Sequence, residues 1–256
     1  MVKNLLIITV AAYYIPQLLG IGDLGRFLGL WSIASPFFMP YQFFTYMFAH
    51  AGFWHLFGNM LGLYFLGTTL EQFWGSKRFL IFYMVTGIGA GILYAGIKYI
   101  SNIPMKKAMQ EYVANPNPDD FYIYLSKYDL EEFSRQERFI DYYSANDSEN
   151  VKEDSKSIIK NSYLHKSTGL MLGASGAIYA ILMAFGLLFP NTQMMIFPFP
   201  IPIKAKYLVL GFGAYAVYSL FKNSSGDQVA HLAHLTGMIF GFIMIKLWDK
   251  DRNNFY

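Results

Sequence analysis

Long apolar runs dominate this sequence, and they restrict how the chain can fold more than any other feature. The runs lie near residues 4–20, 52–70, 79–100, 174–189, 206–222 and 229–248. Each is about 16 to 22 residues long, and roughly 20 apolar residues in a helix cross the hydrocarbon of a bilayer. Only 14% of the residues are charged, against about 25% in an average soluble domain. The sequence therefore predicts an all-α, polytopic membrane protein with six transmembrane helices.

The loops between the runs predict their orientation. Glycine or proline in the segments 75–78, 190–206 and 222–227 would end the helices there. One side of the membrane receives Lys3, Lys77, Arg78, Lys204, Lys206, Lys246, Lys250 and Arg252, whereas the other receives only Arg26 and Lys222. The positive-inside rule then places both termini in the cytoplasm. The first run lacks a small-residue cleavage pattern, so we expect a retained helix. The expected location is the inner membrane of a bacterium.

Composition excludes several function classes. The chain has no cysteine, so disulfides, thiolate-bound zinc and thiol catalysis are excluded. Its net charge of +3 is too small to indicate a nucleic-acid partner. We expect no cofactor and no bound metal, and the lipid bilayer is the first partner that the composition predicts.

Residues 101–168 interrupt the apolar pattern. More than half of the Asp and Glu residues lie between 111 and 154. Apolar and aromatic side chains recur there at helix-like spacing, at Phe121, Leu125, Tyr128, Phe133, Phe139 and Tyr143. This pattern predicts a soluble, partly helical insertion that rests on the outer headgroups, between transmembrane segments 1–100 and 169–256. Residues 144–157 are expected to form a flexible linker.

Polar residues interrupt three of the predicted spans, where they are costly and usually mark a functional interior. They are His50, His55 and Asn59 near the start of the second run, Ser175 at the start of the fourth, and His231 and His234 at the start of the sixth. These three runs begin on the same, outer side of the membrane. All of these residues fall within about two turns of a helix start, so they should share one depth.

The chemistry that suits these groups is acyl transfer. Ser175 becomes a nucleophile only if a neighbouring base takes its proton, and a neutral imidazole can do so near pH 7. His234, Gly237 and Gly241 form a small-residue stripe that allows close helix packing, which would bring His234 to Ser175. Glycines at 173 and 176 would let a substrate backbone approach. No acidic residue is placed to orient the base.

Three segments resemble motifs of one family. "HAGFWHLFGN", "GASGAIYA" and "AHLAHLTGMIFG" are similar, in this order, to the HxxxxHxxxN, GxSG and AHxxGxxxG motifs of the rhomboid intramembrane serine proteases. The resemblance implies a Ser175–His234 dyad that cleaves transmembrane segments of membrane proteins near the outer face. It implies an oxyanion hole and supporting residues at His55, Asn59, Gly173, Tyr179 and His50, with Tyr179 packed on the imidazole and His50 supporting the outer mouth. It also implies a structural role for Glu71.

Several alternatives remain open from the sequence. His231 competes with His234, although only His234 has glycine three and seven residues later. An inactive rhomboid-like protein would bind membrane substrates without cutting them. A metalloenzyme would use His50, His55, His231 and His234, and a transporter would line a path with the same polar groups. The long insertion departs from the usual family pattern, and the oligomeric state is open.

Overall fold

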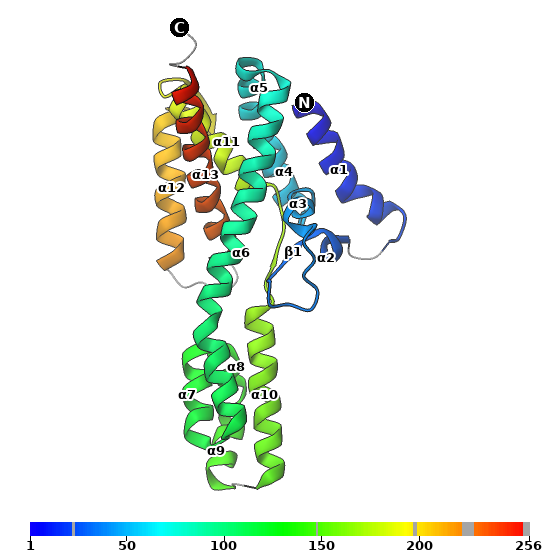
Figure 1. The fold of residues 1–256 in the computed structure, drawn as a ribbon, viewed down its shortest axis with the longest axis vertical. Coiled ribbons are helices and arrows are strands. Elements are labelled where there is room, and N and C mark those ends of the chain that lie inside the picture. The colour runs from blue at the N-terminus through cyan, green and yellow to red at the C-terminus, as the bar shows by residue number, and fades with distance from the viewer. Residues whose placement is uncertain (22–23, 147, 197–198, 222–227, 253–256) are drawn as a thin grey trace. The chain divides into compact units, whose positions relative to one another are not determined.

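The computed structural model describes residues 1–21, 24–146, 148–196, 199–221 and 228–252, and it is mostly helical (Figure 1). The chain divides into two compact units. Unit 1 comprises Met1–Leu30, Met39–Tyr94 and Leu170–Tyr256, and unit 2 comprises Trp31–Phe38 and Ala95–Gly169. The predicted break at 222–227 lies outside the described residues. The predicted division at residues 101 and 168 stays a prediction.

Each of the six predicted runs is helical over most of its described length. The first corresponds to α1 (Val2–Leu18), the third to part of α6 (Ser76–Ala114), and the fourth to α11 (Ser175–Leu188). The fifth and sixth correspond to α12 (Ala205–Phe221) and α13 (Gln228–Arg252). By length and composition alone, two described helices qualify as membrane spans, within Ser76–Ala114 and His231–Trp248, and α1, α11 and α12 are shorter apolar helices.

The second run is divided into three pieces. These are α4 (Phe53–Gly62), a π-helical turn η2 (Leu63–Gly67) and α5 (Thr68–Trp74). A π turn widens the helix locally and occurs frequently at functional sites. Before α4 come the short α2 (Leu24–Leu28), α3 (Gln42–Thr45) and the 3₁₀ turn η1 (Tyr46–Phe48).

Within unit 1, α11 and α13 pack against each other over their length, with α12 beside both (Figure 1). A Cβ atom added to Gly237 would overlap the Gly176 carbonyl, and one added to Gly241 would lie 2.7 Å from the Ala180 carbonyl oxygen. Residues 176 and 180 thus face residues 237 and 241 in the same order, so the two helices are parallel. Glycine at both positions is what allows their backbones to touch.

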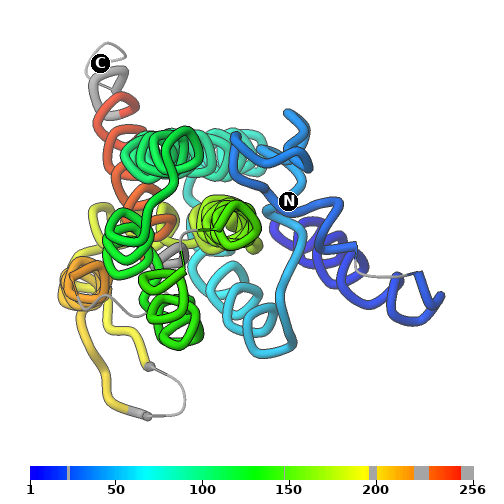
Figure 2. Tube along the Cα trace, turned by 90° about the horizontal axis from the view of Figure 1, so that it is seen from below, coloured from blue at the N-terminus to red at the C-terminus, as the bar shows by residue number. Residues whose placement is uncertain are grey.

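Two short strand pairs correct the all-helical prediction. β1 (Leu30–Trp31) pairs with β2 (Leu170–Met171), and β3 (Gln193–Ile196) pairs antiparallel with β4 (Phe199–Lys204). Prolines at 200 and 202 cannot continue a helix, and the isoleucines at 201 and 203 favour extended backbone. The β3–β4 hairpin connects α11 to α12, as the yellow segment in Figure 2 shows.

Unit 2 contains a helical lobe with its own core. Its helices are the C-terminal part of α6, α7 (Pro118–Tyr128), α8 (Leu130–Arg135), α9 (Glu137–Ala145) and α10 (Glu149–Ser167). Asn117 caps α7 by accepting a hydrogen bond from the Asp120 N–H at 2.9 Å, with proline at the first helical position. The buried side chains that form the core are Met105, Tyr112, Phe121, Tyr124, Leu125, Tyr143, Val151, Ile159 and Tyr163.

The prediction of a flexible linker at 144–157 is wrong. From Glu149 onward this segment belongs to α10. Its Lys152 and Lys156 pair with Glu149 and Glu153 one turn earlier. Every fourth side chain (Val151, Ser155, Ile159) is buried. On this buried face, Ser155 forms a hydrogen bond with the hydroxyl of Tyr112 from α6. Burial raises the pKa of Tyr112, so this hydroxyl is neutral. The polar composition thus describes only the outer face of an amphipathic helix.

Candidate active site

Ser175 is the first residue of α11, and a turn that contains a positive-φ glycine precedes it. Gly173 has a positive φ of 111°, which only glycine adopts without strain. Its N–H donates to the Tyr46 carbonyl at 2.9 Å. A Cβ atom on Gly173 would lie 2.6 Å from the Cε1 and Nε2 atoms of His55. The turn therefore holds the backbone before Ser175 directly against the His55 imidazole.

His55 and Asn59 are joined on α4, one turn apart. The Asn59 side-chain amide donates to the His55 carbonyl at 2.8 Å, and Asn59 is buried. The Nδ1 atom of His55 accepts a long hydrogen bond of 3.4 Å from the Ala51 N–H. A neutral imidazole that accepts at Nδ1 carries its proton on Nε2. The Nε2 atom is the one beside Gly173, so a donor faces the turn that leads to Ser175.

His234 lies against Tyr179, which follows Ser175 by one turn of α11. Their ring centroids are 3.9 Å apart and the rings are nearly parallel, at 6°. Residues four apart share a helix face, so Ser175 and Tyr179 point in the same general direction. The parallel packing of α11 and α13 brings the helix turn with His234 to the level of the serine.

Ser175, His234, His55, Asn59 and Tyr179 line one cavity of about 510 Å³. Pockets that hold small molecules usually measure about 300–1,000 Å³. The remaining walls are apolar and aromatic, and they include Trp54, Phe65, Met194, Met195 and Phe212. These residues were not among the sequence-based site candidates, because an aromatic residue in an apolar run, or a methionine in the segment between two runs, carries no signal of a site.

His231 is near the site but is not among the residues lining this cavity. It is buried, and its ring meets those of Tyr215 and His234 edge-on, at centroid distances of 5.4 Å and 6.0 Å. Of the two histidines on α13, His234 is thus the one that shares the cavity with Ser175 and the stacking with Tyr179.

His50 lies beside His55. Its side chain is buried, and the two ring centroids are 5.0 Å apart. His50 lines a smaller cavity of about 190 Å³, together with Tyr13 and Gln17 of α1. It is not among the residues that line the Ser175 cavity.

Glu71, for which the resemblance implies a structural role, makes contacts away from these residues. Its carboxylate accepts hydrogen bonds from the Val2 N–H at 2.8 Å, from the Met1 amine and from the Ser76 hydroxyl. These bonds hold the start of α1 to the end of α5. Within the described ranges, no group of three or more His, Asp or Glu residues is arranged to hold a metal ion.

The comparisons with known proteins agree with one another on the family. A family model described as "Rhomboid domain" matches residues 38–105 and 156–248. Both matched ranges together contain every candidate site residue, and the unmatched residues 106–155 fall in the helical lobe.

Named relatives carry the same description. Rhomboid protein 1, mitochondrial, of Saccharomyces cerevisiae is 26% identical over 207 residues, which cover 80% of this chain and 42% of that protein. An uncharacterized mitochondrial rhomboid protein of Schizosaccharomyces pombe is 39% identical over 90 residues, 33% of this chain and 22% of that protein. RHOMBOID-like protein 1 of Arabidopsis thaliana is 42% identical over 53 residues, 21% of this chain and 14% of that protein.

The chain thus spans less than half the length of these relatives. All three are eukaryotic, so they give no support to the predicted bacterial location. The family match covers more than half of the chain and includes all the residues on which the resemblance rests. The protein belongs to the rhomboid family of membrane proteins.

Proposed function

We propose that this protein is an intramembrane serine endopeptidase that cuts transmembrane segments of membrane proteins near the outer face. One observation carries the proposal: Ser175 and His234 line the same cavity. Tyr179 holds the imidazole by stacking, and the donor-bearing edge of His55 borders the turn before Ser175.

In the proposed reaction, His234 takes the proton of Ser175 as the serine oxygen attacks the carbonyl carbon of the scissile peptide bond. The developing oxyanion receives hydrogen bonds from His55, Asn59 and the Ser175 N–H. Asn59 has two amide protons and uses one on the His55 carbonyl, so the second is available. His234 then protonates the leaving amine as the C–N bond breaks. Water hydrolyses the acyl ester and restores the serine.

The membrane arrangement forms part of the proposal. We assign the six helical runs to six spans, with both termini on the side that receives most of the basic residues. The substrate is then a membrane protein whose helix opens locally near the outer leaflet, because a helical backbone conceals its carbonyls. The lipid bilayer is the surrounding partner, and no cofactor takes part.

The proposal is tested with a fluorophosphonate probe, which labels activated serines, together with cleavage of a transmembrane reporter. We expect labelling and cleavage in the wild type, and neither in Ser175→Ala or His234→Ala. His231→Ala is the matched control, since it removes an imidazole from the same helix outside the cavity, and it should keep both activities. Labelling that persists without His234, or folded wild-type protein that neither labels nor cleaves, would contradict the proposal and favour an inactive binding protein.

A further inference from the structure

The cavity that Ser175 lines extends away from the serine along α11 and along the helix that begins with α4. On α11 its lining extends from Ser175 to Leu182, a distance of about 10 Å at 1.5 Å rise per residue. On the opposite wall it extends from His55 through Gly62 to Leu66, which is roughly 15 Å along the helix. The cavity is therefore an elongated groove with the reactive groups at one end.

The β3–β4 hairpin forms the far end of this groove. Met194 and Met195 of β3 line the cavity, although they follow Ser175 by about twenty residues and come after α11 has ended. Within the hairpin, these methionines pair with Ile203 and Pro202 of β4, so the two strands are joined to each other. The Ala205 N–H at the start of α12 also donates to the Thr192 carbonyl at 2.9 Å.

The side chains at the far end suit a variable apolar occupant. Met195 is 74% exposed, so its side chain is not required for packing. Methionine is flexible and polarizable, and it adapts to apolar partners of different shapes. The other groups at this end are Phe65, Leu66, Leu182 and Leu208, and none of them is charged.

Near the reactive end, one position of the groove wall carries no side chain. Gly58 lines the cavity, and a Cβ atom added there would meet no heavy atom within 4 Å. The wall is therefore open beside Gly58, which follows His55 by three residues, about one helical turn.

We infer that Met194 and Met195 are specificity-determining residues that contact the membrane-embedded part of the substrate, beyond the cut. This inference rests on the proposed function. A helical segment advances 1.5 Å per residue, so over the groove's length of about 10 to 15 Å the methionines would meet side chains roughly seven to ten residues from the scissile bond. The occupant is an apolar segment of the substrate itself, because the groove is continuous with the cavity of Ser175.

The experiment compares two substrates on the full protein in detergent or liposomes. One is a reporter with its complete transmembrane segment, and the other is a peptide that ends about three residues beyond the same cut. In the double variant Met194→Ala/Met195→Ala, we expect kcat/KM for the complete segment to fall about tenfold, and kcat/KM for the short peptide to stay within about twofold. Fluorophosphonate labelling of Ser175 should be unchanged, which also shows that the variant is folded.

Ile201→Ala is the matched control, because Ile201 is an exposed apolar residue of the same hairpin outside the cavity lining. It should leave both substrates unaffected. Met194→Leu/Met195→Leu should restore most of the loss. Equal losses on both substrates, or no loss on either, would overturn the inference. Absence of fluorophosphonate labelling in the wild type would instead overturn the proposed function, so the two failures are distinguishable.

Discussion

The rings of Tyr179 and His234 are stacked at a centroid distance of 3.9 Å. This contact joins α11 to α13 at the candidate site, and the cavity lining around it contains no carboxylate. In the proposed Ser175–His234 dyad, which has no third member, the aromatic face of Tyr179 would orient the imidazole as an acidic group does in a triad.

The first prediction follows from this contact. Tyr179→Ala should lower reporter cleavage by about 100-fold, because a misplacement of about 1 Å at a reacting group costs this much. Tyr179→Phe keeps the ring and should retain most of the activity. The comparison is made by single-turnover cleavage rates. Equal rates for the alanine and phenylalanine variants would show that stacking does not position His234.

The second prediction concerns the turn before Ser175. Gly173→Ala should abolish cleavage, since the added methyl would lie 2.6 Å from His55 and the positive φ strains any other residue. Gly20 offers a matched control, because it also has positive φ but a Cβ there meets nothing within 4 Å. Gly20→Ala should cost only about 1–2 kcal/mol of stability, without loss of labelling. Similar activities for both variants would contradict the assigned contact.

A third prediction concerns the contact of α11 with α13. Gly241→Ala would place a methyl group 2.7 Å from the Ala180 carbonyl oxygen, so the helices must separate, and both thermal stability and labelling should fall. Gly211→Ala, on α12, adds a methyl group where nothing lies within 4 Å, and it should be neutral. Thermal unfolding in detergent, followed by tryptophan fluorescence, measures both. A neutral Gly241 variant would argue against close packing here.

The fourth prediction tests Gly58, where the wall of the groove is open. Gly58→Leu should be tolerated by the fold, because the position borders empty space, yet it should block cleavage of the reporter with a complete transmembrane segment. Gly211→Leu makes the same change outside the groove. If both leucine variants cleave this reporter at the wild-type rate, the substrate does not pass along Gly58.

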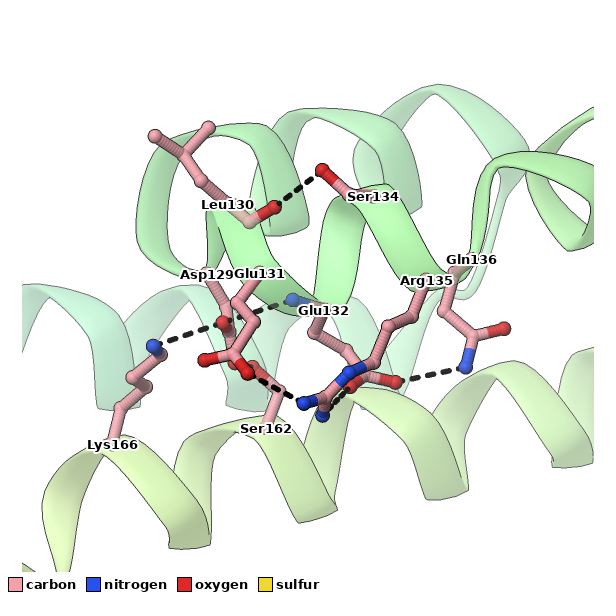
Figure 3. A network of polar contacts seen from close by, with 9 residues as sticks. All are labelled: Asp129, Leu130, Glu131, Glu132, Ser134, Arg135, Gln136, Ser162 and Lys166. Carbon is pink, nitrogen blue, oxygen red and sulfur yellow. Dashed lines mark hydrogen bonds and ion pairs between the residues drawn. The ribbon is translucent and has the colours of Figure 1, made fainter. Parts of the chain in front are cut away.

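A final prediction concerns the helical lobe, where Asp129 joins α8 to α10 (Figure 3). Its carboxylate accepts from the Glu132 N–H at 3.2 Å and from the Ser162 hydroxyl at 2.9 Å, and it pairs with Lys166 at 3.0 Å. Asp129 is only 4% exposed, so Asp129→Ala leaves buried donors unsatisfied and should destabilise the lobe by about 1–3 kcal/mol.

Glu131 provides the comparison, since its pair with Arg135 is exposed on both sides, and such pairs contribute less than about 1 kcal/mol. Hydrogen exchange of α7–α10 should therefore accelerate strongly in Asp129→Ala and only slightly in Glu131→Ala. Comparable exchange in the two variants would mean that the buried network does not stabilise the lobe.

The sequence by itself determined the helical runs and the identity of the polar residues within them, because both are local properties. A run of apolar residues in a bilayer has to form its backbone hydrogen bonds internally, so it is helical. A serine between glycines, or a histidine, within such a run can be recognised from the sequence alone. The same reasoning failed at 149–157, where the polar residues belong to the outer face of α10 and burial is set by its partners. It also missed the strand pairs, which depend on contacts between distant segments.

Only the tertiary structure decided which of these groups meet. The parallel packing of α11 and α13, permitted by Gly237 and Gly241, brings His234 rather than His231 to the cavity of Ser175. The structure also shows that His50, beside His55, lines a different and smaller cavity, and that Met194 of β3 lines the cavity of Ser175. Spacing along one helix fixes a face, but the distance between two helices depends on every side chain between them, and this information is spread over the whole chain.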